Sequence, residues 1–120
     1  MGFKAILKSI VEESCGGLGV VIMGYDGISI DEYVAQGAAL DVQTMTIEYA
    51  SVLKEIKRTV GVLKTGDLEE VSIITEQCSV IVRGISEDFF VALVMTSEGN
   101  FGKARYLLKR AAPGLREALQ

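Results

Sequence analysis

The sequence contains no histidine, a single proline and only two cysteines. The absence of histidine removes the commonest general base and the commonest metal ligand. Cys15 and Cys78 form no CxxC pair, which favours buried or partly buried reduced thiols. Because Pro113 is the sole proline and lies near the C-terminus, no proline-rich linker divides the chain. These absences argue against an enzyme and favour a protein that acts through its surface.

Strong positive charge and long apolar runs are also missing. The net charge of −4 argues against a nucleic-acid-binding protein, which needs a basic face. No apolar run approaches the roughly 18 residues that span a bilayer, so we expect no transmembrane segment and a cytoplasmic location. The 120 residues, 49% of them hydrophobic, suffice for one domain over residues 1–120 that buries a core without disulfides or metal.

Hydrophobic periodicity and turn residues predict three helices and five strands. Glycines after Cys15 end a short first helix, Asp26-Gly27 predicts a tight hairpin turn, and Asp41 is a plausible N-cap. Pro113-Gly114 is expected to end or break the last helix. The predicted elements after the first helix are strands Leu18–Met23 and Ile28–Ala35, helix Val42–Leu63, strands Leu68–Thr75, Cys78–Ile85 and Phe89–Met95, and a closing helix from about Asn100 to Ala112.

The contrast between strands predicts the sheet. Phe89–Met95 is apolar on both sides, which predicts a central strand. In Ile28–Ala35 apolar and polar residues alternate, which predicts an edge strand. The short turns between the last three strands indicate consecutive antiparallel hairpins. The predicted fold class is therefore α+β: a sheet of about five antiparallel strands in the order 2-1-5-4-3, with the long helix on one face and the two terminal helices on the other.

The long predicted helix has apolar residues on two different faces. We predict that one stripe docks on the sheet; its members are Val42, Met45, Tyr49, Val52, Leu53, Ile56, Val60 and Leu63. On the opposite side we expect small or apolar residues among charged ones: Ile47, Ala50 and Ser51 with Lys54, Glu55 and Arg58. A second apolar face on a surface helix predicts a partner.

Two motifs admit a functional reading but favour a structural one. Gly99–Ala104 resembles a phosphate loop, yet it lacks the required spacing and has Ala104 where a Ser or Thr would bind magnesium, so a helix-entry turn is favoured. The closing helix carries a basic run of Lys103, Arg105, Lys109, Arg110 and Arg116. A solvated face is the simpler interpretation of that run, and docking to an acidic partner or a membrane surface is the alternative.

The third predicted strand leaves an exposed sheet edge. Val71, Ile73 and Ile74 on an uncovered edge would favour aggregation unless the edge is covered or paired. Pairing with a second copy across a two-fold axis would solve this and would place two long helices side by side. The sequence therefore predicts a homodimer.

Two segments, with the order of the elements, carry a family resemblance. The hairpin Gly24–Ile30 and the helix entry Asn100–Leu108 resemble the roadblock family, the dynein light chain roadblock type with its bacterial and archaeal relatives. The chain looks most similar to the short prokaryotic MglB-like proteins. The resemblance covers essentially the whole chain and implies a profilin-like three-layer sandwich that homodimerises through the middle helix and third strand. It also implies a platform for a Ras-like small GTPase, with activation, where present, through the GTPase's own catalytic residues and no cofactor.

Candidate residues follow from these faces and from the resemblance. The predicted dimer interface consists of Ile47, Ala50, Val71, Ile73 and Thr75. The predicted GTPase-binding surface consists of Ile47, Ser51, Lys54, Glu55 and Arg58, so the two surfaces overlap.

The alternative function is a small-molecule-sensing or ligand-binding domain of profilin-like architecture. That function requires a cavity lined by convergent polar groups, which the apolar strand interiors do not offer.

Overall fold

The computed structural model describes residues 3–120 and contains three helices and five strands. The elements are α1 (Lys4–Glu13), β1 (Gly17–Gly24), β2 (Ser29–Val34), α2 (Val42–Leu63), β3 (Glu70–Ile74), β4 (Cys78–Gly84), β5 (Phe89–Thr96) and α3 (Phe101–Ala118). All strand pairs are antiparallel, and the order β2-β1-β5-β4-β3 confirms the predicted order.

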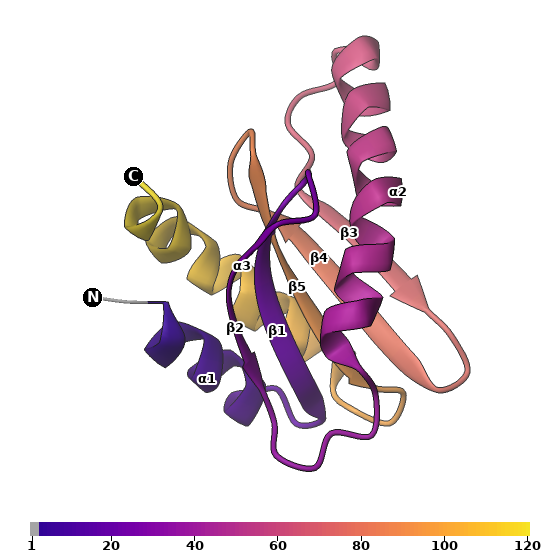
Figure 1. The fold of residues 1–120 in the computed structure, drawn as a ribbon, viewed down its shortest axis with the longest axis vertical. Helices are drawn as coiled ribbons and strands as arrows, with labels where there is room; N and C mark the ends of the chain where they lie inside the picture. The colour runs from indigo at the N-terminus through magenta and orange to yellow at the C-terminus, as the bar shows by residue number, and fades with distance from the viewer. Residues whose placement is uncertain (1–2) are drawn as a thin grey trace.

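The elements form three layers (Figure 1). Helix α2 lies alone on one face of the sheet, while α1 and α3 lie together on the other. Alternate residues of the central strands serve two cores, since successive side chains of a strand point to opposite faces. Val20 and Ile22 of β1 pack under α1 and α3, whereas Val21 and Met23 pack under α2. The predicted α+β sandwich is confirmed.

Local signals fix the ends of the elements. The Asp41 carboxylate accepts a hydrogen bond from the Thr44 backbone N–H (3.1 Å) and so caps α2, as predicted. This bond is the main cause of the lowered pKa of Asp41. Asn100 caps α3 in the same way through the Lys103 N–H (3.0 Å). Gly27 adopts a left-handed φ of 89°, which the tight turn between β1 and β2 requires.

Two expectations from the sequence were wrong. Helix α3 runs through Pro113 to Ala118, because Leu115 beyond the proline is fully buried and its packing holds the last turns helical. Cys15 is exposed: its left-handed φ of 54° lies in the turn after α1, where the side chain is not enclosed by the core. Cys78 is buried and reduced, as expected.

Candidate functional site

Exposed apolar residues are most numerous on one helix. Nine large apolar side chains are exposed among residues 3–120, and four of them belong to α2: Ile47, Val52, Val62 and Leu63. Three others, Ile28, Ile30 and Val34, lie in or next to β2, and Ile74 of β3 points to the face of the sheet away from α2. Scattered apolar residues are ordinary on protein surfaces, but a concentration on one element marks an interaction site. Helix α2 is therefore the first candidate surface.

A hydrogen bond shows how α2 is oriented on the sheet. The Gln43 side-chain amide donates to a Glu32 carboxylate oxygen of β2 (2.7 Å), so this flank of α2 faces β2. Val52 follows Gln43 by nine positions, which is about 180° around a helix at about 100° per residue. Val52 therefore lies on the opposite flank, toward β4 and β3, where it remains 54% exposed. Leu63 lies on the same flank and is 64% exposed.

This orientation corrects the predicted stripe of α2. Val52 and Leu63 were expected to face the sheet and instead reach solvent. Ala50 and Thr46 are buried against the sheet in their place. Because Ala50 is 2% exposed and packs in the chain's own core, its predicted place on the outer face of α2 was wrong. Its predicted place in a dimer interface stays a prediction.

Strand β3 supplies the second half of the surface. It pairs only with β4, so within residues 3–120 its outer edge has no neighbouring strand. Val71 and Ile73 pair with Val82 and Val80, which belong to the core under α2, and both are half-buried. We call Val52, Leu63, Val71 and Ile73 the α2–β3 seam.

The remaining predicted residues separate into two places. Thr75 follows the end of β3, where its hydroxyl donates to the Cys78 carbonyl (3.2 Å) and accepts from the Cys78 N–H (3.3 Å). Thr75 thus closes the turn before β4. Ile47, Ser51, Lys54, Glu55 and Arg58 are all exposed and lie within one outward strip of α2. We call these five residues the outer strip.

Sequence reasoning missed the seam flank of α2, because an apolar residue counts the same whether it faces a core or a partner. The outer strip carries both charges: the Arg58 guanidinium lies 3.4 Å from the Glu55 carboxylate. Exposed pairs of this kind contribute little to stability, so both groups remain available to a partner.

The basic run on α3 is largely engaged within the chain. Arg105 donates to both carboxylate oxygens of Glu70 at 3.0 Å each, and the Arg110 guanidinium lies 3.5 Å from the Glu13 carboxylate. Arg116 donates to the Ile85 carbonyl at 2.6 Å. These contacts favour the solvated structural face over a dedicated docking face.

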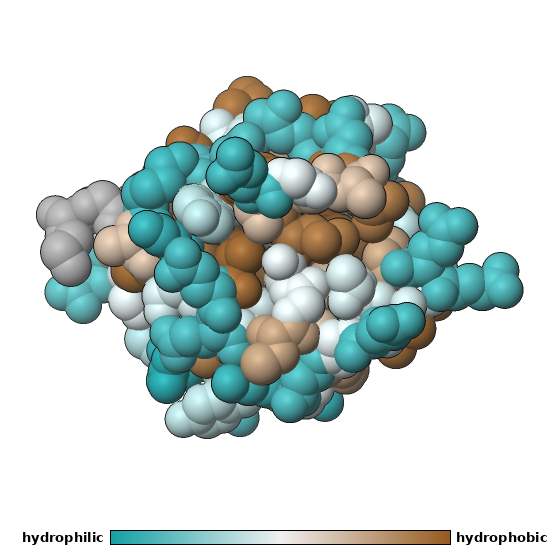
Figure 2. All heavy atoms as spheres, turned by 90° about the horizontal axis from the view of Figure 1, so that it is seen from below, coloured by the Kyte–Doolittle hydropathy of each residue, from teal (hydrophilic) through white to brown (hydrophobic). Residues whose placement is uncertain are grey.

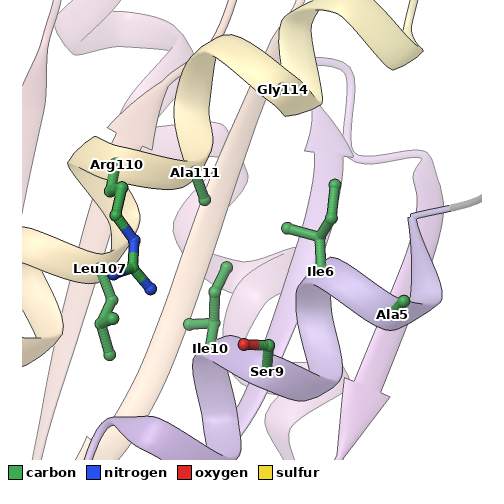
Figure 3. A pocket seen from close by; sticks show the side chains of 8 residues that line it. All are labelled: Ala5, Ile6, Ser9, Ile10, Leu107, Arg110, Ala111 and Gly114. Carbon is green, nitrogen blue, oxygen red and sulfur yellow. The ribbon is translucent and has the colours of Figure 1, made fainter.

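A shallow hollow of about 340 Å³ lies between α1 and α3 (Figure 3). Ile6 and Ile10 point into it from α1, and Leu107 and Ala111 line it from α3. Arg110 is its one charged group, and its guanidinium already contacts Glu13. This groove offers apolar contact but no convergent chemistry.

The end of the molecule at which α2 begins shows apolar side chains ringed by hydrophilic ones (Figure 2). In residues 3–120, no three His, Cys, Asp or Glu side chains come together in a way that could hold a metal ion. Likewise, none of the described helices has the length and apolar character needed to cross a membrane.

Comparisons with known proteins support the fold. No protein-family model matches the chain, and no curated protein sequence does. Among solved structures, the chain is similar to MglC from Myxococcus xanthus, with 38% identity over 98% of both chains and a TM-score of 0.73. It is also similar to the gliding protein MglB from Thermus thermophilus (18% identity over 96% of this chain and 86% of that chain, TM-score 0.83). A third is a Roadblock/LC7 domain from Streptomyces avermitilis (16% identity over 96% and 95%, TM-score 0.79).

The same fold is found in profilin IB from Acanthamoeba castellanii, which is 13% identical over 97% of this chain and 98% of that chain with a TM-score of 0.63. This likeness confirms the profilin-like description of the sandwich.

Proposed function

Because this chain belongs to the Roadblock/LC7 family, we propose that it is a non-enzymatic platform that pairs with a second copy of itself and binds a Ras-like small GTPase. The observation that carries the proposal is the concentration of exposed apolar side chains on α2, together with the edge of β3, which has no neighbouring strand within residues 3–120. We place the platform in the cytoplasm, where a Ras-like GTPase would meet it.

Homodimerisation is supported by the α2–β3 seam. Two β3 edges related by a two-fold axis can pair their free N–H and C=O groups, which continues the sheet from one protomer to the next. Val71 and Ile73 would then be covered from the α2 side, together with Val52 and Leu63 of the helix. Both backbone pairing and apolar burial favour this contact over a solvated edge.

GTPase binding is supported by the outer strip. When two α2 helices lie side by side, their outer strips form one continuous surface on the same side of the dimer. Ile47, 51% exposed, supplies the apolar centre, and Lys54 and Arg58 supply positive charge around it. Apolar anchors surrounded by polar groups are the usual composition of a transient protein interface.

The direct test is capture of a Ras-like GTPase, loaded with GTP or GDP, on the immobilised protein. Ile47→Asp and Lys54→Glu should each weaken capture at least about tenfold, because each places a negative charge on the contact surface. Lys8→Glu on α1 is the matched control and should capture normally. If both outer-strip variants remain dimeric and capture as well as the unaltered protein, the outer strip is not the binding surface.

A hydrolysis assay separates binding from activation. From the family resemblance, we propose that any acceleration acts through the GTPase's own catalytic residues. Acceleration should then persist when each exposed arginine of α2 and α3 is replaced singly by lysine. Loss of activation, with capture intact, in one such variant would instead indicate an inserted arginine.

A further inference from the structure

A hollow of about 500 Å³ lies at the end of the sheet where α2 ends, the upper end in Figure 1. Five segments meet there: the end of β1, the last turns of α2, the loop before β3, the end of β4 and the last turns of α3. The volume is that of a typical small-molecule site. Several charged side chains line the hollow, in contrast to the apolar interiors of the strands.

Cations lie inside the hollow and carboxylates lie at its rim. The Lys57 side chain is 26% exposed, and its ammonium lies 3.0 Å from Glu87, whose side chain is 82% exposed. The Arg83 side chain is 16% exposed and lies 3.6 Å from Glu69, which is 78% exposed. A partly buried cation needs a counter-charge, and a solvated carboxylate supplies it weakly. An anion that binds inside the hollow would therefore pair with these cations more closely than the rim carboxylates do.

A third cation is held at the same hollow. The Arg116 Nε–H donates to the Ile85 carbonyl at 2.6 Å, which fixes the guanidinium and leaves its terminal N–H groups for another acceptor. Lys57 is positioned by the Tyr25 ring, whose centroid lies 5.4 Å from the ammonium. Ordered cations lose little side-chain entropy when they bind a ligand.

Neutral groups complete the lining. Burial and, secondarily, the Glu87 charge raise the pKa of Tyr25 to about 12. Its hydroxyl is therefore a neutral hydrogen-bonding group in the lining. That hydroxyl would lie 3.6 Å from a side chain placed at Gly84. Gly61, Gly66 and Gly84 also line the hollow.

Carboxylates that line the same hollow limit its affinity for an anion. Asp67, Glu69 and Glu87 line the same hollow, and the C-terminal end of α2 adds partial negative charge. A ligand must displace the rim carboxylates from Lys57 and Arg83 to bind. Binding should therefore be modest and sensitive to salt.

We propose that this hollow is a binding site for a compact dianion of the phosphate-monoester or dicarboxylate class, held by Lys57, Arg83 and Arg116. Two or more charges are needed because the anion replaces two rim carboxylates. The site is distinct from the α2–β3 seam and from the outer strip, and it goes beyond the platform function.

The test is a ¹H–¹⁵N NMR titration at constant ionic strength with inorganic phosphate in one arm and succinate in the other. We expect saturable shifts at the amides of Gly61, Gly66, Gly84 and Ser86 in at least one arm, with Kd of about 1 mM or lower. The arm with the lower Kd identifies the ligand class. Absence of saturation in both arms, or shifts confined to Lys103 and Lys109 on α3, would overturn the proposal.

Variants locate the site. Lys57→Met keeps the aliphatic stem and should weaken binding at least about tenfold, whereas Lys54→Met, one turn earlier and outside the hollow, should leave Kd unchanged. Glu87→Gln removes a competing carboxylate from an exposed rim position and should tighten binding about threefold. Equal Kd values in all four proteins would contradict the site. Dimerisation and GTPase capture, measured in parallel with Lys57→Met, should be unaffected, so failure of either proposal is distinguishable.

Discussion

Gly84 lies where β4 leaves the sheet, against the loop that leads into β3. Its backbone N–H donates to the Glu69 carbonyl (3.0 Å), which draws the two segments together. A Cβ at this position would lie 2.3 Å from the Leu68 carbonyl oxygen, a backbone atom that cannot move without breaking the pairing. The close approach therefore depends on a residue without a side chain.

We predict that Gly84→Ala lowers the free energy of unfolding by about 2 kcal/mol, the usual cost of overpacking. Gly61→Ala is the matched control: nothing lies within 4 Å of its Cβ, and alanine is the better helix former. It should raise stability by up to about 1 kcal/mol. Urea denaturation of the three proteins measures both changes. A Gly84→Ala protein as stable as the parent would show that the loop containing Leu68 moves to accommodate the added methyl group.

Tyr25 makes stability depend on alkaline pH. Its ring packs on Phe90 with centroids 5.1 Å apart, and its folded-state pKa is about 12 against an ordinary 10.0. Because the folded pKa is the higher one, unfolded chains lose this proton first as pH rises. The stability present below pH 10 is therefore lost between pH 10 and about 12.

We predict that the unaltered protein loses about 2 kcal/mol more stability across this window than Tyr25→Phe does. Phenylalanine keeps the ring and removes the titrating group, so lysine titration is common to both proteins and cancels in the difference. Guanidinium denaturation at pH 9 and pH 11.5 measures it. Parallel pH profiles of the two proteins would assign the alkaline loss to other groups.

At the scale of an element, α3 shows packing overriding local propensity. Pro113 has no N–H to donate to the Lys109 carbonyl, which costs about 3 kcal/mol in an isolated helix. The helix nevertheless continues, since Leu115 is fully buried and Leu119 packs against the core under α1 and α3. The turns after the proline therefore depend on Leu115.

We predict that Leu115→Ala costs 2 to 5 kcal/mol, roughly the range for a buried leucine, and also reduces helical circular dichroism as residues 113–118 fray. Leu119→Ala, at a half-buried position, should cost roughly half as much and keep the helical signal. Thermal and urea unfolding followed at 222 nm test both. Equal losses in the two variants would mean that Leu115 does not anchor the end of α3.

The contrast between local sequence preference and tertiary packing also determines how much of the fold could be predicted from the sequence. Short-range signals were sufficient for Asp41, for the Asp26-Gly27 turn and for the hairpins, because capping, turn chemistry and hairpin length act over a few residues. The pairing of β1 with β5 joins distant segments and was predicted instead from strands that are apolar on both faces. The orientation of α2 was not predictable from its pattern. Val52 and Ala50 exchanged places, since the rotation of a helix is set by its packing against the sheet, where Ala50 and Leu53 are buried. For the candidate site, the outer strip was predicted and the seam flank was missed.

At the scale of the whole molecule, the two edges of the sheet differ. Edge strand β2 is protected: Asp31 forms an ion pair with Lys4 of α1 at 2.9 Å, and an irregularity between Ile22 and Met23 interrupts its register. Charges and bulges of this kind discourage edge pairing. Strand β3 keeps regular register over its whole length and presents Ile73 beside α2. The edge available to a second copy is therefore β3.

We predict that the protein is a dimer by light scattering and that Ile73→Lys makes it monomeric. Ile73 lies on the α2 side of the edge, where a buried lysine would find no counter-charge in the seam. Ser72→Lys is the matched control, because Ser72 pairs with Ile81 of the opposite core and so faces the other side of the sheet. It should remain dimeric. Folding linked to association should also make Tm rise with protein concentration in the parent and in Ser72→Lys, but not in Ile73→Lys. A parent protein that stays monomeric at millimolar concentration, or an Ile73→Lys dimer as tight as the parent, would remove the seam from the interface and with it the continuous outer surface on which GTPase binding depends.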